Sequence, residues 1–312
     1  MLNRRFLRIK VMQALYSFFQ HEEANQAFFE KELYKSLEKI HELYFSILGL
    51  LIDLHHASLL VIDESKNKHL PTKDDLNPNL KFAENSLLVS LSNSKEVRLQ
   101  LEGKKISWQN DFDLVKKLFY EIRDGDAYKN YLMSGSTGFK EDRDFIIELI
   151  LEHLTENEVL ISLFEEKNIH WADDTFVAFN SVIRNLEDFE GEFKMQPLLK
   201  DEKDDYAFVS VLFNKTILYR KQLEELIDKH TKNWEIERIA NMDMLLMEMA
   251  LTEILHLPNI PVKASLNEYI DISKEYSTPN SKVFVNGVLD KIIIELKHDN
   301  KINKTGRGLK EN

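Results

Sequence analysis

The stretch TPNSKVFVNGVLDKII, residues 278–293, combines a helix start with an apolar face at helical spacing. Thr278 followed by Pro279 predicts an N-cap with proline in the first turn, where its missing N–H costs nothing. Apolar residues recur every three or four positions and predict one buried stripe: Phe284, Val288, Leu289, Ile292 and Ile293. Gly287 lies beside this stripe. Because a mid-helix glycine costs about 1 kcal/mol relative to alanine, we expect Gly287 to let another helix come close.

Glycine and proline are scarce, with nine glycines and six prolines among 312 residues. No glycine occurs between Gly191 and Gly287, and no asparagine-glycine or aspartate-glycine pair joins two alternating apolar runs. This pattern favours long helices over hairpins, so the sequence predicts an all-α fold. The length allows two cores, or one core with a large insertion.

The residue types exclude several classes of site. The chain has no cysteine, which rules out disulfides, zinc-thiolate sites, iron–sulfur clusters and cysteine nucleophiles. The ten histidines include no HExxH pair, so we expect no metal site, no cofactor and no catalytic residues. The glycine-rich run at 134–138 lacks the Gly-Lys-Ser/Thr ending of a phosphate-binding loop and predicts a turn between helices.

Residues 43–62 are mostly apolar and approach the length of roughly 20 residues that a membrane span requires. Asp53, His55 and His56 interrupt this run, and a charge at mid-membrane costs about 2.5 to 3.5 kcal/mol. We therefore expect a buried helix of a soluble protein. Apolar residues are interleaved with the basic residues of the N-terminus and no small-residue cleavage site follows, so we expect no signal peptide and a cytoplasmic location.

Two boundaries divide the helical pattern. One is the loop at about 65–79, which contains two prolines, and the other is a Lys- and Asp-rich segment at about 191–205. Thr155 and Glu158 have capping-box spacing and predict a helix start there. Residues 299–312 contain Lys301, Lys304, Arg307 and Lys310 without an apolar pattern and predict a flexible basic tail. The expected helices are 3–20, 26–63, 83–102, 108–132, 139–153, 156–167, 172–189, 205–230, 234–256, 261–275 and 279–297.

The first expected helix is the strongest candidate for a binding surface. Its apolar residues share one face, and we expect its basic residues on the other faces. Arg4, Arg5, Arg8 and Lys10 place four positive charges in the first ten residues of a chain with net charge −12. The planar arginine fork suits phosphate, and screening over about 8 Å lets a local basic patch bind RNA although the whole protein is acidic. Lys282, at the start of the last helix, could extend this patch. The alternative is that these residues only confer solubility.

Several ordered motifs resemble the NusB family of bacterial transcription antitermination factors. The segment RRFLRIKVMQALYS, residues 4–17, resembles the family's arginine-rich first helix, which ends in Gln-Ala-Leu-Tyr. The C-terminal part resembles the family through Trp234, Arg238, Ile239, Asp243, Ala250, Glu253, Ile260-Pro261-Val262, Asn267-Glu268, Ile270, Lys274, Tyr276, Ser281 and FVNGVLDKI at 284–292. We therefore expect a NusB-like domain at 1–21 and 205–298, interrupted by a helical insertion of unknown role at 22–204.

The resemblance implies a fold of two small helical bundles that binds the boxA RNA element together with NusE, which is also a small-subunit ribosomal protein. That complex joins the RNA polymerase elongation complex and favours readthrough of ribosomal RNA operons. The resemblance implies RNA contacts from Arg4, Arg5, Arg8 and Gln13. Phe6 stands where family members often have another basic residue, and Lys10 is the candidate replacement. Some members of the family form homodimers.

The polar residues of the C-terminal motifs have a structural interpretation. We expect them to cap or bridge helices, because buried polar groups need partners; they are Asn267, Glu268, Asn286 and Asp290.

Two alternatives come from other functional classes. The same domain occurs fused to RNA cytosine methyltransferases, but such an enzyme needs a catalytic cysteine and a glycine-rich cofactor loop, and the chain has neither. The acidic composition and Phe6 instead leave open a protein-interaction scaffold built on the insertion, with weak or no RNA binding.

Overall fold

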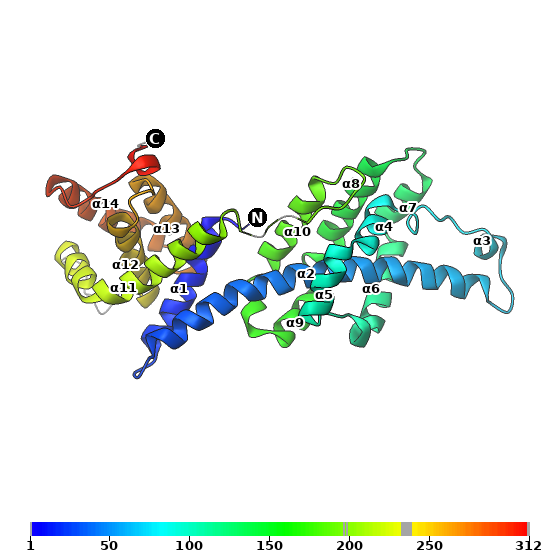
Figure 1. Cartoon of the computed structure of the whole chain (residues 1–312), viewed down its shortest axis with the longest axis horizontal. Helices are drawn as coiled ribbons and strands as arrows, with labels where there is room; N and C mark the ends of the chain where they lie inside the picture. Colours follow the sequence, from blue (N-terminus) through cyan, green and yellow to red (C-terminus); the bar gives the residue numbers. More distant parts are fainter. Residues whose placement is uncertain (1, 196, 198, 232–238, 311–312) are drawn as a thin grey trace. The chain divides into compact units, whose positions relative to one another are not determined.

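The structure is a computed structural model that describes residues 2–195, 197, 199–231 and 239–310. In these residues every regular element is a helix, so the expected all-α fold is confirmed. The chain forms two compact units (Figure 1). We call Leu37–Leu198 the middle unit, and Leu2–Ser36 with Leu199–Asn312 the terminal unit. The division falls inside one helix, so the terminal unit includes residues after 22 that the sequence assigned to the insertion.

The terminal unit is organised around α12, which packs against α1, α11, α13 and α14. Nearly every residue of α12 is buried, including Leu246, Met249 and Leu251 on different sides of the helix. A helix that is apolar all round belongs inside a bundle, which explains its central position. The helices of this unit are α1 (Arg4–Gln20), the beginning of α2 (Gln26–Lys66), α11 (Glu202–His230), α12 (Asn241–His256), α13 (Val262–Tyr276), α14 (Ser281–His298) and the 3₁₀ turn η5 (Gly306–Leu309).

The helix at the family-like C-terminal stretch exists, but it begins later than expected. Its N-cap is Asn280, and Pro279 lies in the turn before the helix. The Thr278 N–H donates to Oγ of Ser281 at 3.1 Å, so Thr278 belongs to this turn and is not the N-cap. The predicted buried stripe is largely correct, because Val288, Leu289, Ile292 and Ile293 are buried while Phe284 is half-buried. The expected helix start at Trp234 lies outside the described residues.

The expectation for Gly287 is wrong. A Cβ placed on this residue would have nothing within 4 Å, so the glycine does not admit a second helix. It is exposed and faces a cavity of about 550 Å³ that is also lined by Val283 and Lys291.

The C-terminal segment also differs from the expected flexible tail. The Thr305 N–H donates to the Pro258 carbonyl at 3.0 Å, and Lys304 Nζ donates to the Leu257 carbonyl at 3.1 Å. Gly308 is buried so tightly that an added Cβ would lie 1.9 Å from the Pro258 carbonyl oxygen. Backbone hydrogen bonds and this close contact therefore hold the segment against the α12–α13 loop. Such contacts leave no apolar pattern in the sequence.

The middle unit has its own aromatic core. Phe82, Phe119, Tyr128 and Phe145 pack with ring centroids 5.3 to 6.2 Å apart. The indole of Trp108 donates a hydrogen bond of 2.8 Å to the Ser46 carbonyl. After the remainder of α2, the elements are α3 (Lys73–Leu76), α4 (Ser86–Asn93), α5 (Lys95–Lys104), η1 (Gln109–Asp111), α6 (Phe112–Asp124), α7 (Asp126–Met133), α8 (Phe139–Leu149), the π-helical η2 (Ile150–Leu154), α9 (Glu158–Lys167), η3 (Ile169–Trp171) and α10 (Thr175–Glu187).

Two helices expected in the middle unit are each divided in the structure. Ser94 ends α4 and caps α5 by accepting a hydrogen bond from the Val97 N–H, and Gly125 separates α6 from α7. The expected capping box at Thr155 is wrong. Asn157 is the N-cap of α9, accepting from the Leu160 N–H at 3.0 Å, while the Thr155 hydroxyl donates back to the Leu151 carbonyl.

Among the described helices, α2 alone is long and apolar enough to cross a membrane. Of its 18 most apolar consecutive residues, 61% are buried inside the protein, as in a core helix. Leu43, Ile47, Leu50 and Leu54, four residues of the run at 43–62, are buried. The helix therefore contributes to the core of the middle unit.

Candidate functional site

The candidate site is built on the first two turns of α1, which carry three arginines. Asn3 starts the helix by accepting a hydrogen bond of 3.0 Å from the Phe6 N–H. The guanidinium group of Arg4 then points toward α11, that of Arg5 toward α13, and that of Arg8 toward α12. Each arginine is paired with carboxylates, which the spacing of the arginines alone does not reveal.

Arg8 is buried, contrary to the expectation that the basic residues of this helix lie away from its apolar face. Its side chain is 4% exposed and donates to both carboxylate oxygens of Glu253, at 2.7 and 2.8 Å. Ser265 and Tyr269 donate to the same carboxylate at 2.7 and 3.1 Å. Burial alone would lower the pKa of Arg8, but the hydrogen bonds and charge of Glu253 raise it above its usual value. Arg8 therefore ties α1 to α12 as a permanent cation inside the bundle.

Arg5 lies nearer the surface, with 36% of its side chain exposed. It donates to Glu268 at 3.0 Å and to Asp271 at 2.7 Å, both on α13. The hydrogen bond to Glu268 raises the pKa of Arg5. Hydrogen bonding from Lys274, together with the charge of Arg5, lowers the pKa of Asp271. Because this pair is accessible to solvent, a phosphate group can compete with the two carboxylates for Arg5.

Arg4 is the third arginine, with 31% of its side chain exposed. It pairs with Asp204 at 2.5 Å and approaches Asp205 at 3.6 Å, both in the first turn of α11. Its guanidinium also lies 4.9 Å from the ring centre of Phe208. Arg4 and Arg5 are therefore the accessible part of the predicted basic patch.

The other predicted RNA-binding residues are less uniform in their positions. Lys10 is 4% exposed and lies 5.4 Å from the ring centre of Phe6. Gln13 is half-buried on α1, and Lys282 is exposed in the first turn of α14. The structure therefore does not present all six predicted residues on one exposed surface.

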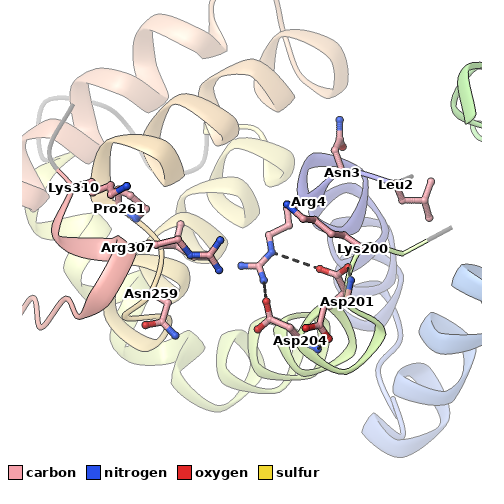
Figure 2. Close-up of a pocket in the computed structure, with 12 residues that line it drawn as sticks. Leu2, Asn3, Arg4, Lys200, Asp201, Asp204, Asn259, Pro261, Arg307 and Lys310 are labelled. Carbon is pink, nitrogen blue, oxygen red and sulfur yellow. Dashed lines mark hydrogen bonds and ion pairs between the residues drawn. The ribbon is translucent and has the colours of Figure 1, made fainter. Parts of the chain in front are cut away.

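A cavity of about 650 Å³ adjoins Arg4 (Figure 2). Its lining combines four basic residues, Arg4, Lys200, Arg307 and Lys310, with three acidic ones, Asp201, Asp204 and Asp205. Figure 2 shows the guanidinium groups of Arg4 and Arg307 pointing toward one another across this space. The sequence does not predict this cavity, because its residues come from the two ends of the chain, from the start of α11 with the residues before it, and from the α12–α13 loop.

The polar residues of the C-terminal motifs have separate roles. Glu268 bridges α13 and α1, as expected, through Arg5 and Arg8. Asn267 and Asp290 are exposed and Asn286 is half-buried. The expectation that these polar residues are buried is therefore wrong for Asn267 and Asp290. Asp243 instead joins helices by accepting from Ser277 at 2.6 Å and from Ser281 at 2.8 Å.

The described residues contain no group of three or more His, Cys, Asp or Glu side chains that could hold a metal ion. Among the described carboxyl groups of the terminal unit, Glu248 has a strongly shifted pKa, and it lines a small cavity of about 270 Å³ with Tyr16, Phe19 and Arg220. Burial raises the pKa of Glu248 to about 8. Neither carboxylate oxygen of Glu248 has a hydrogen-bond partner among the described residues, and Nε of Arg220 lies 3.6 Å from Oε1 of Glu248. This group can hold a proton near neutral pH, and Arg220 is the charged side chain that approaches it.

Comparison with known proteins relates part of the chain to a family. The NusB family model matches residues 175–293. This range begins at the first residue of α10, ends within α14 and does not include α1. No solved structure matches the chain.

Three curated relatives share the name Transcription antitermination protein NusB. The one from Salinibacter ruber is 45% identical over 111 residues, which cover 36% of this chain and 69% of the relative. The one from Chloroherpeton thalassium is 42% identical over 102 residues, covering 33% of this chain and 48% of the relative. The one from Natranaerobius thermophilus is 29% identical over 93 residues, covering 30% of this chain and 67% of the relative.

Proposed function

Because the chain belongs to the NusB family, we propose that it is a transcription antitermination factor that binds RNA and catalyses no reaction. Its ligand is the boxA RNA element, bound together with NusE, and the complex acts on RNA polymerase to promote readthrough of ribosomal RNA operons. This role requires neither cofactor nor metal and takes place in the cytoplasm. A homodimer is compatible with it.

The observation that carries the RNA-binding proposal is the pair of accessible arginines at the start of α1. Arg4 and Arg5 project from consecutive positions, are about one third exposed and already bind oxygen anions in bidentate or two-carboxylate arrangements. Exposed ion pairs of this kind contribute only about 0 to 1 kcal/mol, so RNA phosphates can replace the carboxylates at little cost. Arg8 acts differently, because its buried pair with Glu253 fixes the position of α1. In this proposal Gln13 and Lys282 supplement the two arginines, whereas Lys10, which is 4% exposed, does not contact the RNA directly.

One observation favours the alternative of a protein-interaction scaffold with weak RNA binding. Each of the three arginines of α1 is paired with a carboxylate, so the patch is largely neutralised within the protein. The middle unit would then provide the main binding surface, and removing the charges of Arg4 and Arg5 would not change the affinity for RNA.

The experiment that separates these functions is fluorescence anisotropy with boxA RNA and a scrambled RNA, with and without NusE, across a salt series. For single-stranded nucleic acid, the slope of log affinity against log salt changes by about 0.7 for each phosphate contact. We expect a preference for boxA that NusE strengthens, and a shallower slope for R4Q/R5Q. The control K221Q/K291Q removes two exposed lysines on α11 and α14. No boxA preference under any condition would refute the proposal and favour the scaffold.

A further inference from the structure

The C-terminal segment brings two basic side chains to the cavity beside Arg4. Arg307 lies in η5 and Lys310 directly follows it, and both line the cavity opposite the start of α1 (Figure 2). Among the described residues, no carboxylate pairs with the side chain of Arg307, Lys310 or Lys200. The three acidic residues of the lining have other partners than Arg307, Lys310 and Lys200: Asp204 and Asp205 pair with Arg4 at the same cavity, and Asp201 caps α11.

Two guanidinium groups that point at one another across a cavity repel unless an anion lies between them. Two unit charges 4 Å apart have an interaction energy of roughly 4 kcal/mol at an effective dielectric constant of 20. An anion between the guanidinium groups of Arg4 and Arg307 would therefore be attracted to both. The planar guanidinium donates two parallel hydrogen bonds to anions that present two adjacent oxygens, as phosphate and carboxylate groups do. The cavity of about 650 Å³ is open enough to admit a phosphate with its attached sugars.

We propose that Arg307 and Lys310 form, with Arg4, a pocket for a backbone phosphate of the RNA, so that the C-terminal segment extends the RNA-binding surface of α1. This inference rests on the proposed function. The RNA backbone enters the cavity, Arg307 and Lys310 bind the phosphate, and Arg4 exchanges Asp204 for it. Lys200 lies at the same cavity and adds positive charge.

The position of the segment depends on Gly308. This residue packs against the Pro258 carbonyl, where even a methyl group would meet the oxygen at 1.9 Å. Thr305 adds hydrogen bonds to Pro258 and Asn259 at 3.0 and 3.1 Å. A side chain at position 308 therefore displaces η5 without changing any charge. This separates the effect of the pocket from the effect of net charge.

The test compares full-length variants by anisotropy with boxA RNA across the same salt series. R307Q/K310Q removes the two basic groups, R307K keeps the charge, and G308A keeps all charges while displacing the segment. The matched control is K301Q, because Lys301 belongs to the same segment but does not line the cavity. Circular dichroism establishes that each variant is folded.

If the pocket holds one backbone phosphate, R307Q/K310Q lowers the magnitude of the salt slope by up to about 0.7, which corresponds to one phosphate contact on single-stranded RNA. G308A weakens binding in the same direction, while R307K and K301Q stay near wild type. Two results would overturn the proposed phosphate pocket while the wild type still binds RNA: an unchanged salt slope in R307Q/K310Q, or full RNA affinity in G308A. Either result would leave the proposed function intact. Absence of RNA binding by the wild type would instead refute the proposed function.

Two further outcomes assign the cavity to another ligand. Stabilisation by inorganic phosphate in a thermal melt, together with an unchanged RNA slope in R307Q/K310Q, would identify a site for a free anion and overturn the RNA proposal. Loss of NusE binding in R307Q/K310Q with RNA binding intact would assign the basic groups to a protein partner and would overturn it as well.

Discussion

Arg8 and Glu253 form a two-pronged ion pair inside the terminal unit, with N–O distances of 2.7 and 2.8 Å and almost no exposure of either side chain. The pair joins α1 to α12 across 245 positions of sequence. Arginine at this position therefore has a structural role, which separates it from the neighbouring Arg4 and Arg5.

The first prediction concerns this pair. In R8M the Glu253 carboxylate loses its cation while remaining buried, and breaking a buried pair in this way costs about 3 to 5 kcal/mol. We expect the free energy of unfolding of the terminal unit, measured by urea denaturation, to fall by this amount. The double variant R8M/E253M removes both charges and should recover only part of the loss, because the buried hydroxyls of Ser265 and Tyr269 lose their acceptor. If R8M unfolds like the wild type, the pair does not stabilise the bundle.

The second prediction is a pH dependence of stability that comes from Glu248. Its pKa is about 8 in the folded protein, because burial disfavours the charged form, whereas its ordinary value is 4.5. The folded state therefore binds more protons than the unfolded state between these values, and stability falls as pH rises from about 4.5 to 8. Arg220 opposes this effect and Glu224 adds to it.

The variant E248Q tests this dependence, because glutamine stays neutral at every pH. We expect E248Q to be more stable than the wild type at pH 8 and to lose much of the decline between pH 5 and 8 in thermal melts. The control E225Q alters an exposed residue of α11. Identical pH profiles for E248Q and the wild type would show that Glu248 is not buried as a neutral acid.

The third prediction concerns Gly287. An added methyl group at this position would meet no atom within 4 Å, and the residue lies in the interior of α14. Alanine is favoured over glycine in a helix by about 0.8 to 1 kcal/mol, so G287A should stabilise the protein by up to that amount. Differential scanning calorimetry measures the gain. A destabilised G287A would mean that another molecule or segment requires the space.

The fourth prediction concerns the partner of Arg4. In D204N the guanidinium loses its closest carboxylate and becomes available to RNA, so we expect boxA affinity to rise about two- to fivefold, in line with the energy of an exposed ion pair. E202Q removes a charge from the same turn of α11 without contacting Arg4, and it controls for the change in net charge. Equal effects of D204N and E202Q would show that release of Arg4 contributes nothing.

The sequence predicts the helices of the terminal unit well, because their apolar periodicity is local. The expected ranges 3–20, 205–230 and 261–275 agree within a few residues with α1, α11 and α13. Helix starts are less predictable where several polar residues compete. At the start of α14, Thr278, Asn280 and Ser281 can all bond to the turn, and the N-cap is Asn280.

The site is less predictable than the helices, since it depends on contacts between distant positions. The arginines of α1 are evident in the sequence, but whether each is free or paired depends on Asp204, Glu253 and Glu268, more than 190 positions away. The ordered C-terminal segment is equally hidden, because it docks through backbone hydrogen bonds and through Gly308. The hydropathy pattern predicts neither the pairing of the arginines nor the docking of the C-terminal segment.

Leu2 and Lys310, the first and last residues that the structure describes, line the same cavity from opposite sides in the view of Figure 2. A sequence that replaces the residues before Leu2 or after Lys310, such as an affinity tag, continues from a residue that lines this cavity, so it can compete with whatever enters. Because Leu2 and Lys310 border one cavity, the protein is a candidate for circular permutation, in which a linker spans the cavity and a surface loop is opened elsewhere. Such a permuted chain would keep the bundle while fixing the cavity's two walls to one another.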